Sequence, residues 1–185
     1  IPGSRLFMGL FLVRHCSAMG QAPEAPLTGE GVYQAKKLAD FLCNHGVSRI
    51  ISSPYCRAID SARPLATVLK ISIETDVRLV ERNLGLVSDG DWRAALRESF
   101  EKPLLCLPNG ESSIEAMARG RAVIDELFDD QANTAAVFTH GNLLTLLVRS
   151  FDQQIGFEFW EALNNPDVVQ LYRKASSVAL RKIWT

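Results

Sequence analysis

The stretch MGLFLVRH, residues 8–15, decides the fold, because an apolar run ends there in an arginine and a histidine. A short apolar run with this ending is typical of a buried strand, and it is too short to span a membrane or to serve as a signal peptide. We predict a strand over 8–13, with Arg14 and His15 at its carboxyl end. We expect residues 1–7 to be partly a cloning remnant without a functional role.

Strand and helix patterns alternate along the rest of the chain. Extended segments are predicted at 49–52, 71–80 and 135–139, with two tail strands at 168–172 and 178–184 joined across Ala175-Ser176. Helices are predicted after the cap Thr28, after Ser53-Pro54, after the capping box Ser112-x-x-Glu115 and over 142–151. This alternation predicts a three-layer α/β/α sandwich with a mostly parallel central sheet, formed by a single domain over residues 8–185.

Local details follow from the same patterns. Gly46 should end the first helix, and Pro64 should kink or split the second. Residues 86–110 are the least regular part of the chain, and we expect them to overhang the functional site. Two helix faces should be buried: Val32, Ala35, Leu38, Ala39 and Leu42 in the first helix, and Ile114, Met117, Ile124, Leu127 and Phe128 in the third.

Composition excludes several classes of function. The 20 Lys and Arg nearly balance the 21 Asp and Glu, so no clustered basic surface for nucleic acid is expected. No apolar run approaches the roughly 20 residues that a membrane span requires. The four cysteines lie far apart without a CxxC pair, which favours a reduced, cytoplasmic protein. The oligomeric state stays open.

Three charged or polar segments follow predicted strands: Arg14-His15, the run from Ser52 to Arg57, and Thr139-His140-Gly141. Ligands of open α/β sheets bind at the carboxyl ends of the strands, so two arginines and two histidines should converge there. Such a cluster suits a phosphoryl group, and its positive charge keeps a histidine neutral and nucleophilic. Glu81, just past an extended segment, could protonate a leaving oxygen.

Each of these residues also has a purely structural explanation. An Arg-His pair can end a strand at the surface, Arg57 can be a solvated helix residue, and Glu81 a surface carboxylate. We interpret His45 beside Gly46 only as a favourable charge at a helix end. The common placement at strand ends favours the functional interpretation.

Several motifs together resemble the histidine phosphatase, or phosphoglycerate mutase-like, superfamily. They come in the family's order over roughly residues 8 to 150 and are listed here: Leu12-Val13-Arg14-His15 ("LVRHG"), Leu27-Thr28 to Leu38-Ala39 ("LTxxGxxQAxxLA"), Ser52 to Ala58 ("SSPxxRA"), Glu81 to Gly85 ("ExxxG"), Asn109 to Ser112 ("GGES") and Thr139 to Asn142 ("SHGN"). Any one of these motifs is weak, whereas the ordered set is specific.

The resemblance implies a phosphoglycerate mutase-like fold and a phosphatase that acts on a small phosphorylated substrate. His15 would be phosphorylated and then hydrolysed, and Glu81 would protonate the leaving oxygen. Arg14, Arg57 and His140 would hold the phosphoryl group. The family needs no metal or organic cofactor, and the three histidines show no metal-ligand spacing such as HxxxH.

The sequence departs from the family at three places. Cys16 replaces the glycine after the histidine, and Leu86-Val87-Ser88-Asp89 replaces a "WEG" continuation. The loop before Leu27 lacks an asparagine that often contacts phosphate, and Gln21 is a candidate substitute. Arg82, which follows Glu81 as in mutases, is a further candidate phosphate ligand.

Three other functions were weighed. His15-Cys16-Ser17-Ala18 is similar to a cysteine-dependent phosphatase loop, but the arginine required six residues after the cysteine is Ala22. A mutase is the closer alternative, although mutases usually carry a longer insertion between the acid and the second histidine. A non-catalytic protein that binds phosphorylated ligands is the third, and the presence of nucleophile, arginines and acid argues against it.

Overall fold

The computed structural model of the chain describes residues 9–88, 90–130, 134–174 and 177–184. Residues 1–7, Asp89 and the Ala175-Ser176 junction, on which some sequence predictions fall, lie outside the described residues. The elements are β1 (Gly9–Arg14), α1 (Gly29–Leu42), β2 (Val47–Ser52), α2 (Cys56–Leu69), β3 (Ile73–Thr75), the 3-10 helix η1 (Val77–Leu79), α3 (Trp92–Glu101), α4 (Ser113–Asp129), β4 (Thr134–Thr139), α5 (Gly141–Arg149), α6 (Phe157–Glu161), β5 (Asp167–Lys174) and β6 (Ser177–Lys182).

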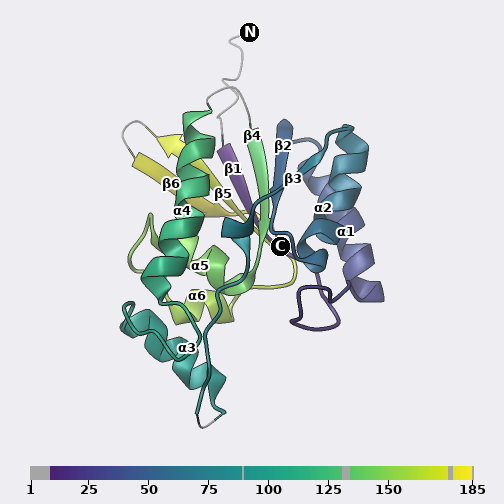
Figure 1. Cartoon of the computed structure of the whole chain (residues 1–185). Coiled ribbons are helices and arrows are strands. Elements are labelled where there is room, and N and C mark those ends of the chain that lie inside the picture. The colour runs from purple at the N-terminus through teal and green to yellow at the C-terminus, as the bar shows by residue number, and fades with distance from the viewer. Residues whose placement is uncertain (1–8, 89, 131–133, 175–176, 185) are drawn as a thin grey trace.

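One mixed sheet has the strand order β3-β2-β4-β1-β5-β6. The pairs β3-β2, β2-β4 and β4-β1 are parallel, while β5 pairs antiparallel with both β1 and β6. Helices α1 and α2 cover one face and α4 and α5 the other (Figure 1). The predicted three-layer α/β/α sandwich with a mostly parallel sheet is therefore confirmed.

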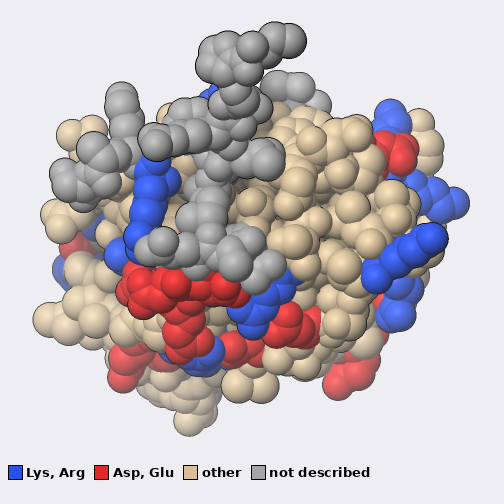
Figure 2. Space-filling view, turned by 90° about the horizontal axis from the view of Figure 1, so that it is seen from above, with Lys and Arg blue, Asp and Glu red and all other residues tan. Residues whose placement is uncertain are grey.

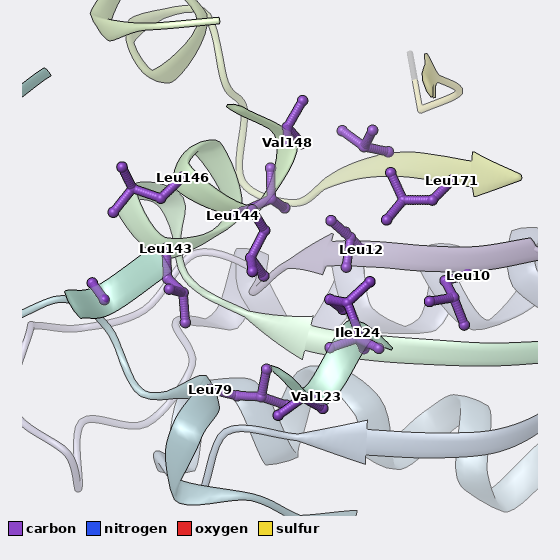
Figure 3. Packing of buried hydrophobic residues seen from close by; sticks show 14 of the residues in the cluster. Leu10, Leu12, Leu79, Val123, Ile124, Leu143, Leu144, Leu146, Val148 and Leu171 are labelled. Carbon is purple, nitrogen blue, oxygen red and sulfur yellow. The ribbon is translucent and has the colours of Figure 1, made fainter. Parts of the chain in front are cut away.

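The alternation of side chains along β1 builds the core on both faces. Leu10 and Leu12 belong to the cluster under α4 and α5, whereas Phe11 and Val13 belong to the cluster under α1 and α2. Figure 3 shows how the leucines of β1 meet aliphatic side chains from α4, α5 and β5. A strand that is buried on both faces reads as a continuous apolar run, which is the pattern of residues 8–13.

The predicted helix starts are confirmed where a side chain caps the helix. Thr28 Oγ1 accepts the N–H of Gly31 at the start of α1. Ser112 and Glu115 form the complete capping box of α4. At α2 the prediction was two residues early, because Tyr55 is the N-cap and the helix begins at Cys56.

The interiors and ends of the helices differ from the sequence prediction at further positions. Pro64 lies inside a helix that is not split, because its neighbours Ala62 and Leu65 are held in the core. Helix α1 ends at Leu42, and Gly46 supplies the positive φ of 70° that turns the chain into β2. Val32 and Ile114, expected on buried faces, are exposed, since each lies in the first turn of its helix beyond the edge of the covered face.

Two helices were not predicted. Helix α3 lies within residues 86–110, and its polar sequence leaves only Leu96, Ser99 and Phe100 buried. Helix α6 has five residues, too few for a periodic pattern. The extended segment expected over 71–80 is shorter than predicted, because η1 follows the three residues of β3.

Charges of both signs lie side by side on the face seen from above in Figure 2. Two carboxylates, Glu74 and Asp130, meet Arg49, and Arg78 bridges Asp76 and Glu126. Within the described residues, none of the helices combines the length and the apolar character needed to cross a membrane.

Candidate active site

The carboxyl ends of three adjacent strands bring the predicted site residues together. Strand β4 lies between β1 and β2, so His15, Ser53 and His140 follow neighbouring strands. The N–H of His15 donates to the carbonyl of Thr139 (3.0 Å), and the N–H of Ser53 donates to the carbonyl of Phe138 (2.9 Å). These bonds extend the sheet by one residue and fix the backbone beneath the side chains. The expected convergence at one sheet edge is therefore what the structure shows.

The hydrogen bonds of His15 define its tautomer. Nδ1 lies 2.7 Å from the carbonyl oxygen of Cys16, which can only accept, so Nδ1 carries the proton. Nε2 accepts from Nε of Arg57 at 3.2 Å and therefore carries the lone pair. Burial, together with the charges of Arg57 and Arg14, lowers the pKa of His15 to about 4. The ring is thus neutral at pH 7, with Nε2 as the nucleophilic atom.

Arg57 is almost wholly buried, with 1% of its surface exposed. Besides its bond to His15, its Nη1 donates to the carbonyl oxygens of Gln21 (3.1 Å) and Ala22 (3.0 Å). Gln21 thus holds Arg57 through its backbone, while its exposed side chain borders the cavity. The guanidinium also lies over the ring of Tyr55, 5.0 Å from its centroid.

His140 is fully buried beside His15, with 5.2 Å between ring centroids. Its Nε2 lies 2.8 Å from Oγ of Ser53, and its Nδ1 has no partner. Burial, reinforced by the nearby His15 and arginine charges, holds the pKa of His140 well below its usual value. Two neutral imidazoles therefore meet at this edge of the sheet.

Arg14 crosses the start of α5. Its Nη1 donates to the carbonyl of Leu163 at 2.9 Å, and its Nε is buried without a partner. A Cβ at Gly141 would lie only 3.1 Å from this Nε, so the glycine allows the guanidinium to pack against the helix start. Close approach of this kind is a position where glycine is required.

Glu81 caps helix α5. Its two carboxylate oxygens accept the N–H groups of Asn142 (3.1 Å) and Leu143 (2.9 Å), and one also accepts the N–H of Arg82 (2.9 Å). A helix N-terminus offers free N–H groups and a positive dipole end to a carboxylate. This capping places the carboxyl group in the wall of the cavity that holds His15 and Arg14.

The side chain of Arg82 is tied to the protein at two atoms. Nε donates to the carbonyl of Glu111 (3.1 Å) and Nη1 to Oγ of Ser99 (2.7 Å). The residue borders the cavity and is 5% exposed. Its bonds make Arg82 a link between the Glu81 segment and α3, a role that its position in the sequence did not indicate.

A cavity of about 570 Å³, the size of a small-molecule site, is lined by Arg14, His15, Gln21, Glu81 and Arg82, whereas Arg57 and His140 are not among its described lining residues. The described residues that line it are Arg14, His15, Ser17, Ala18, Gln21, Glu81, Arg82, Leu84, Trp92, Leu96, Gly141, Asn142, Trp160 and Asn165. Three buried polar atoms in the described part of the chain lack a partner: Nε of Arg14, Nδ1 of His140 and Oδ1 of Asn142. Since buried polar atoms are nearly always paired, their gathering at one place marks a ligand site.

Sequence reasoning missed several residues of this site. The Nδ2 of Asn165 donates to the carbonyl of His15 at 2.8 Å, just before the cis peptide Asn165-Pro166. Trp92 of α3 and Trp160 of α6 line the outer part of the cavity. The Asn-Pro pair was a readable turn signal, whereas only the tertiary fold brings the two tryptophans together.

Cys16 directly follows His15 and is buried in the core under α1 and α2. Its N–H donates to Oγ of Ser61 at 2.9 Å, and burial raises the pKa of its thiol to about 11. The thiol is therefore protonated at pH 7 and unsuited to attack. All four cysteines are free. The described residues include no group of three or more His, Cys, Asp or Glu placed to hold a metal ion.

Known proteins resemble this chain both in sequence and in structure. A curated protein of Yersinia pestis (strain Pestoides F), named "Probable phosphoglycerate mutase GpmB", is 28% identical over 157 aligned residues, covering 75% of this chain and 72% of that protein. A mycobacterial glucosyl-3-phosphoglycerate phosphatase, solved with inorganic phosphate, superposes with a TM-score of 0.75 at 25% identity over 96% of each chain. A phosphoglycerate mutase from Bacillus anthracis gives 0.74 at 19% identity, covering 95% of this chain and 92% of that one.

The family assignment rests on a match over nearly the whole chain. The model of the histidine phosphatase superfamily (branch 1) matches residues 10–183, which include every strand end of the site. The chain therefore belongs to the histidine phosphatase superfamily.

Proposed function

We propose that the protein is a phosphatase that hydrolyses phosphate monoesters through a phosphohistidine intermediate on His15. The observation that carries the proposal is the neutral tautomer of His15, a residue that lines the cavity and whose Nε2 lone pair faces the buried Arg57. A neutral imidazole is the nucleophilic form, and adjacent guanidinium groups stabilise the charge on the phosphoryl oxygens.

In the first step, Nε2 of His15 attacks phosphorus as the bond between phosphorus and the ester oxygen breaks. Glu81, protonated for this step, gives its proton to the leaving oxygen, and the alcohol departs. In the second step a water molecule transfers a proton to Glu81 and its oxygen attacks phosphorus. The bond between phosphorus and Nε2 breaks, phosphate leaves, and His15 and Glu81 return to their starting forms.

Arg14, Arg57 and His140 hold the phosphoryl group in this proposal. The unpartnered Nε of Arg14 supports this role, because a phosphoryl oxygen would satisfy this buried donor. The unpartnered Nδ1 of His140 would do the same in the tautomer in which Oγ of Ser53 donates to Nε2 and Nδ1 carries the proton. Gln21 lies at the rim and is proposed as a contact for the substrate. Arg82 is proposed to act with them through the guanidinium nitrogen that its bonds to Glu111 and Ser99 leave over.

Phosphate release from a panel of phosphate monoesters tests the proposal, with rapid acid-free quenching and 31P NMR to detect phosphohistidine. We expect phosphate release and a phosphohistidine signal from the native protein, and neither from His15→Ala. His45→Gln is the matched control, because His45 bonds the carbonyl of Phe41 at the end of α1, outside the cavity. Equal turnover in native protein and His15→Ala would refute the proposal.

Phosphoglycerate mutase activity is the second candidate, favoured by the names of the curated relatives. A mutase must return the phosphoryl group to a bound acceptor and exclude water meanwhile. Only 58 residues separate Glu81 from His140, which leaves little chain for an enclosing insertion. Incubation with 3-phosphoglycerate and a bisphosphoglycerate primer separates the two reactions. Isomerisation faster than phosphate release would establish the mutase.

A further inference from the structure

The outer part of the site cavity is aromatic and apolar. Trp92 of α3 and Trp160 of α6 stand edge to face there, with ring centroids 5.9 Å apart and planes at 83°. Leu84 and Leu96 complete this wall. Trp92 is 53% exposed, which leaves much of a large ring uncovered beside a functional cavity. We call these four residues the aromatic wall.

Two arginines beside the aromatic wall are held in ion pairs, and one of them, Arg93, lies over the ring of Trp160, 5.9 Å from its centroid. Arg93 pairs with Glu161, and Arg97 pairs with Glu158 at 2.7 Å while lying over the ring of Phe157. Both arginines therefore join α3 to α6. Neither is among the described residues that line the cavity.

The cavity lining carries few charged side chains, Arg14, Glu81 and Arg82 among its described residues. Among the described lining residues, the cations are Arg14 and Arg82. Arg14 lies beside His15 and Gly141, and Arg82 is held by Glu111 and Ser99. A second anionic group placed against Trp92, Trp160 and the two leucines would meet apolar side chains. An anion placed against apolar groups loses hydration without gaining a partner.

We propose that the aromatic wall is the subsite for the alcohol part of the substrate, and that it selects phosphomonoesters of uncharged aromatic alcohols over phosphoglycerates and other doubly anionic esters. The phosphoryl group binds at His15, and a planar ring packs against Trp92 and Trp160. Stacking and apolar burial both favour such a ring. The inference rests on the proposed function for turnover, but its binding preference can be measured without turnover.

The test uses three phosphonates that cannot be hydrolysed: 2-phenylethylphosphonate, propylphosphonate and 3-phosphonopropionate. Isothermal titration calorimetry with the native protein should show the phenyl compound binding roughly tenfold tighter than the propyl compound. The carboxylate compound should bind no tighter than the propyl compound. Tighter binding of the carboxylate than of the phenyl compound, or no binding of any of the three, would overturn the proposal.

Variants of the two tryptophans test whether the aromatic wall causes the preference for the phenyl compound. Trp92→Ala and Trp160→Ala should each lower the affinity for 2-phenylethylphosphonate severalfold and leave propylphosphonate unchanged. Because Trp92 is half exposed, its replacement should not unfold the protein. Tyr33→Ala is the control, since Tyr33 is an equally exposed ring on α1 that contacts Lys37. An unchanged ratio in both tryptophan variants would contradict the subsite.

Hydrolysis of 2-phenylethyl phosphate and propyl phosphate separates this inference from the proposed function. If the phenyl phosphonate binds tighter but neither ester releases phosphate, the phosphatase proposal fails and the subsite stands. If both esters are hydrolysed with equal kcat/KM and the two phosphonates bind equally, the subsite fails and the phosphatase stands.

Discussion

Nε of Arg57 lies 3.2 Å from Nε2 of His15, so the atom proposed to attack phosphorus already accepts a hydrogen bond from a cation. A protonated Nε2 would place two N–H donors and two positive charges against each other. The contact therefore exists only with neutral His15. The charge of Arg57 also adds to the effect of burial in lowering the pKa of the ring. A phosphoryl group could take over the same guanidinium nitrogen as Nε2 forms its bond to phosphorus.

The pKa of His15 can be measured directly. We expect the ring signals of His15, followed by NMR between pH 3 and 8, to titrate near pH 4 instead of the usual 6.5. Burial is the main cause, and the charges of Arg57 and Arg14 act in the same direction. His15→Gln assigns the signal by its loss. A midpoint at or above 6.5 would show that the ring is not held neutral.

Stability should depend on pH through the same ring. Protonation is harder for His15 in the folded than in the unfolded protein, so stability is full above the unfolded pKa of about 6.5 and is lost as pH falls toward 4. The lowered pKa of His140 acts in the same sense. Urea unfolding at pH 7, 6 and 5 should show a loss approaching about 1.4 kcal/mol per pH unit from His15, and His140 should add to this loss. His15→Gln should reduce this slope, and an unchanged slope would assign the effect elsewhere.

Cys16 should be dispensable for the reaction. We expect Cys16→Ser to keep most of the phosphatase activity and His15→Ala to abolish it, because the thiol is buried with a pKa near 11. A hydroxyl in the apolar surroundings of Cys16 should lower the free energy of unfolding by about 1–3 kcal/mol, measured in urea. The opposite pattern of activities would make the cysteine the nucleophile.

The parallel part of the fold and the convergence of Arg14, His15 and His140 at one sheet edge could be predicted from the sequence. Strand β1 is buried on both faces, which produces a continuous apolar run, and Arg14 and His15 follow it directly. Parallel strands then bring His140 to the same edge without further information. This part of the prediction was possible because each charged or polar segment directly follows a strand in the sequence.

The aromatic wall could not be predicted, because it depends on contacts between distant segments. Trp92 and Trp160 come from two short, polar or irregular stretches that only the fold brings together. The bonds from Arg82 to Ser99 and Glu111 were likewise not indicated by its place after Glu81 in the sequence. Side-chain direction within a loop leaves no periodic pattern in a sequence.

Glu81 can be tested as the general acid through the leaving group. Glu81→Gln should lower kcat/KM for alkyl phosphates by roughly 10²–10⁴, because an alkoxide needs a proton to depart. For p-nitrophenyl phosphate the loss should be much smaller, since nitrophenolate leaves without one. Glu30→Gln, an exposed glutamate in the first turn of α1, is the control. Equal losses for both substrates would instead indicate that Glu81 acts by capping α5.

Two glycines in the first turn of α1 offer a matched pair for testing how that helix supports the nucleophile. A Cβ at Gly31 would overlap the carbonyl oxygen of Ser17, two residues after His15, whereas a Cβ at Gly29 would meet no atom within 4 Å. The same oxygen accepts the N–H of Thr28, so it cannot move without disturbing the cap of α1. Gly31→Ala should therefore push the helix away from the loop that carries His15.

We expect Gly31→Ala to lose about 1–3 kcal/mol of unfolding free energy and most of the phosphatase activity. Gly29→Ala should be neutral or gain up to roughly 1 kcal/mol, because alanine is the better helix former. Urea unfolding and kcat/KM of the two variants, measured side by side, check both statements. If Gly31→Ala matched Gly29→Ala in both, the close packing of α1 on Ser17 would not be what positions His15.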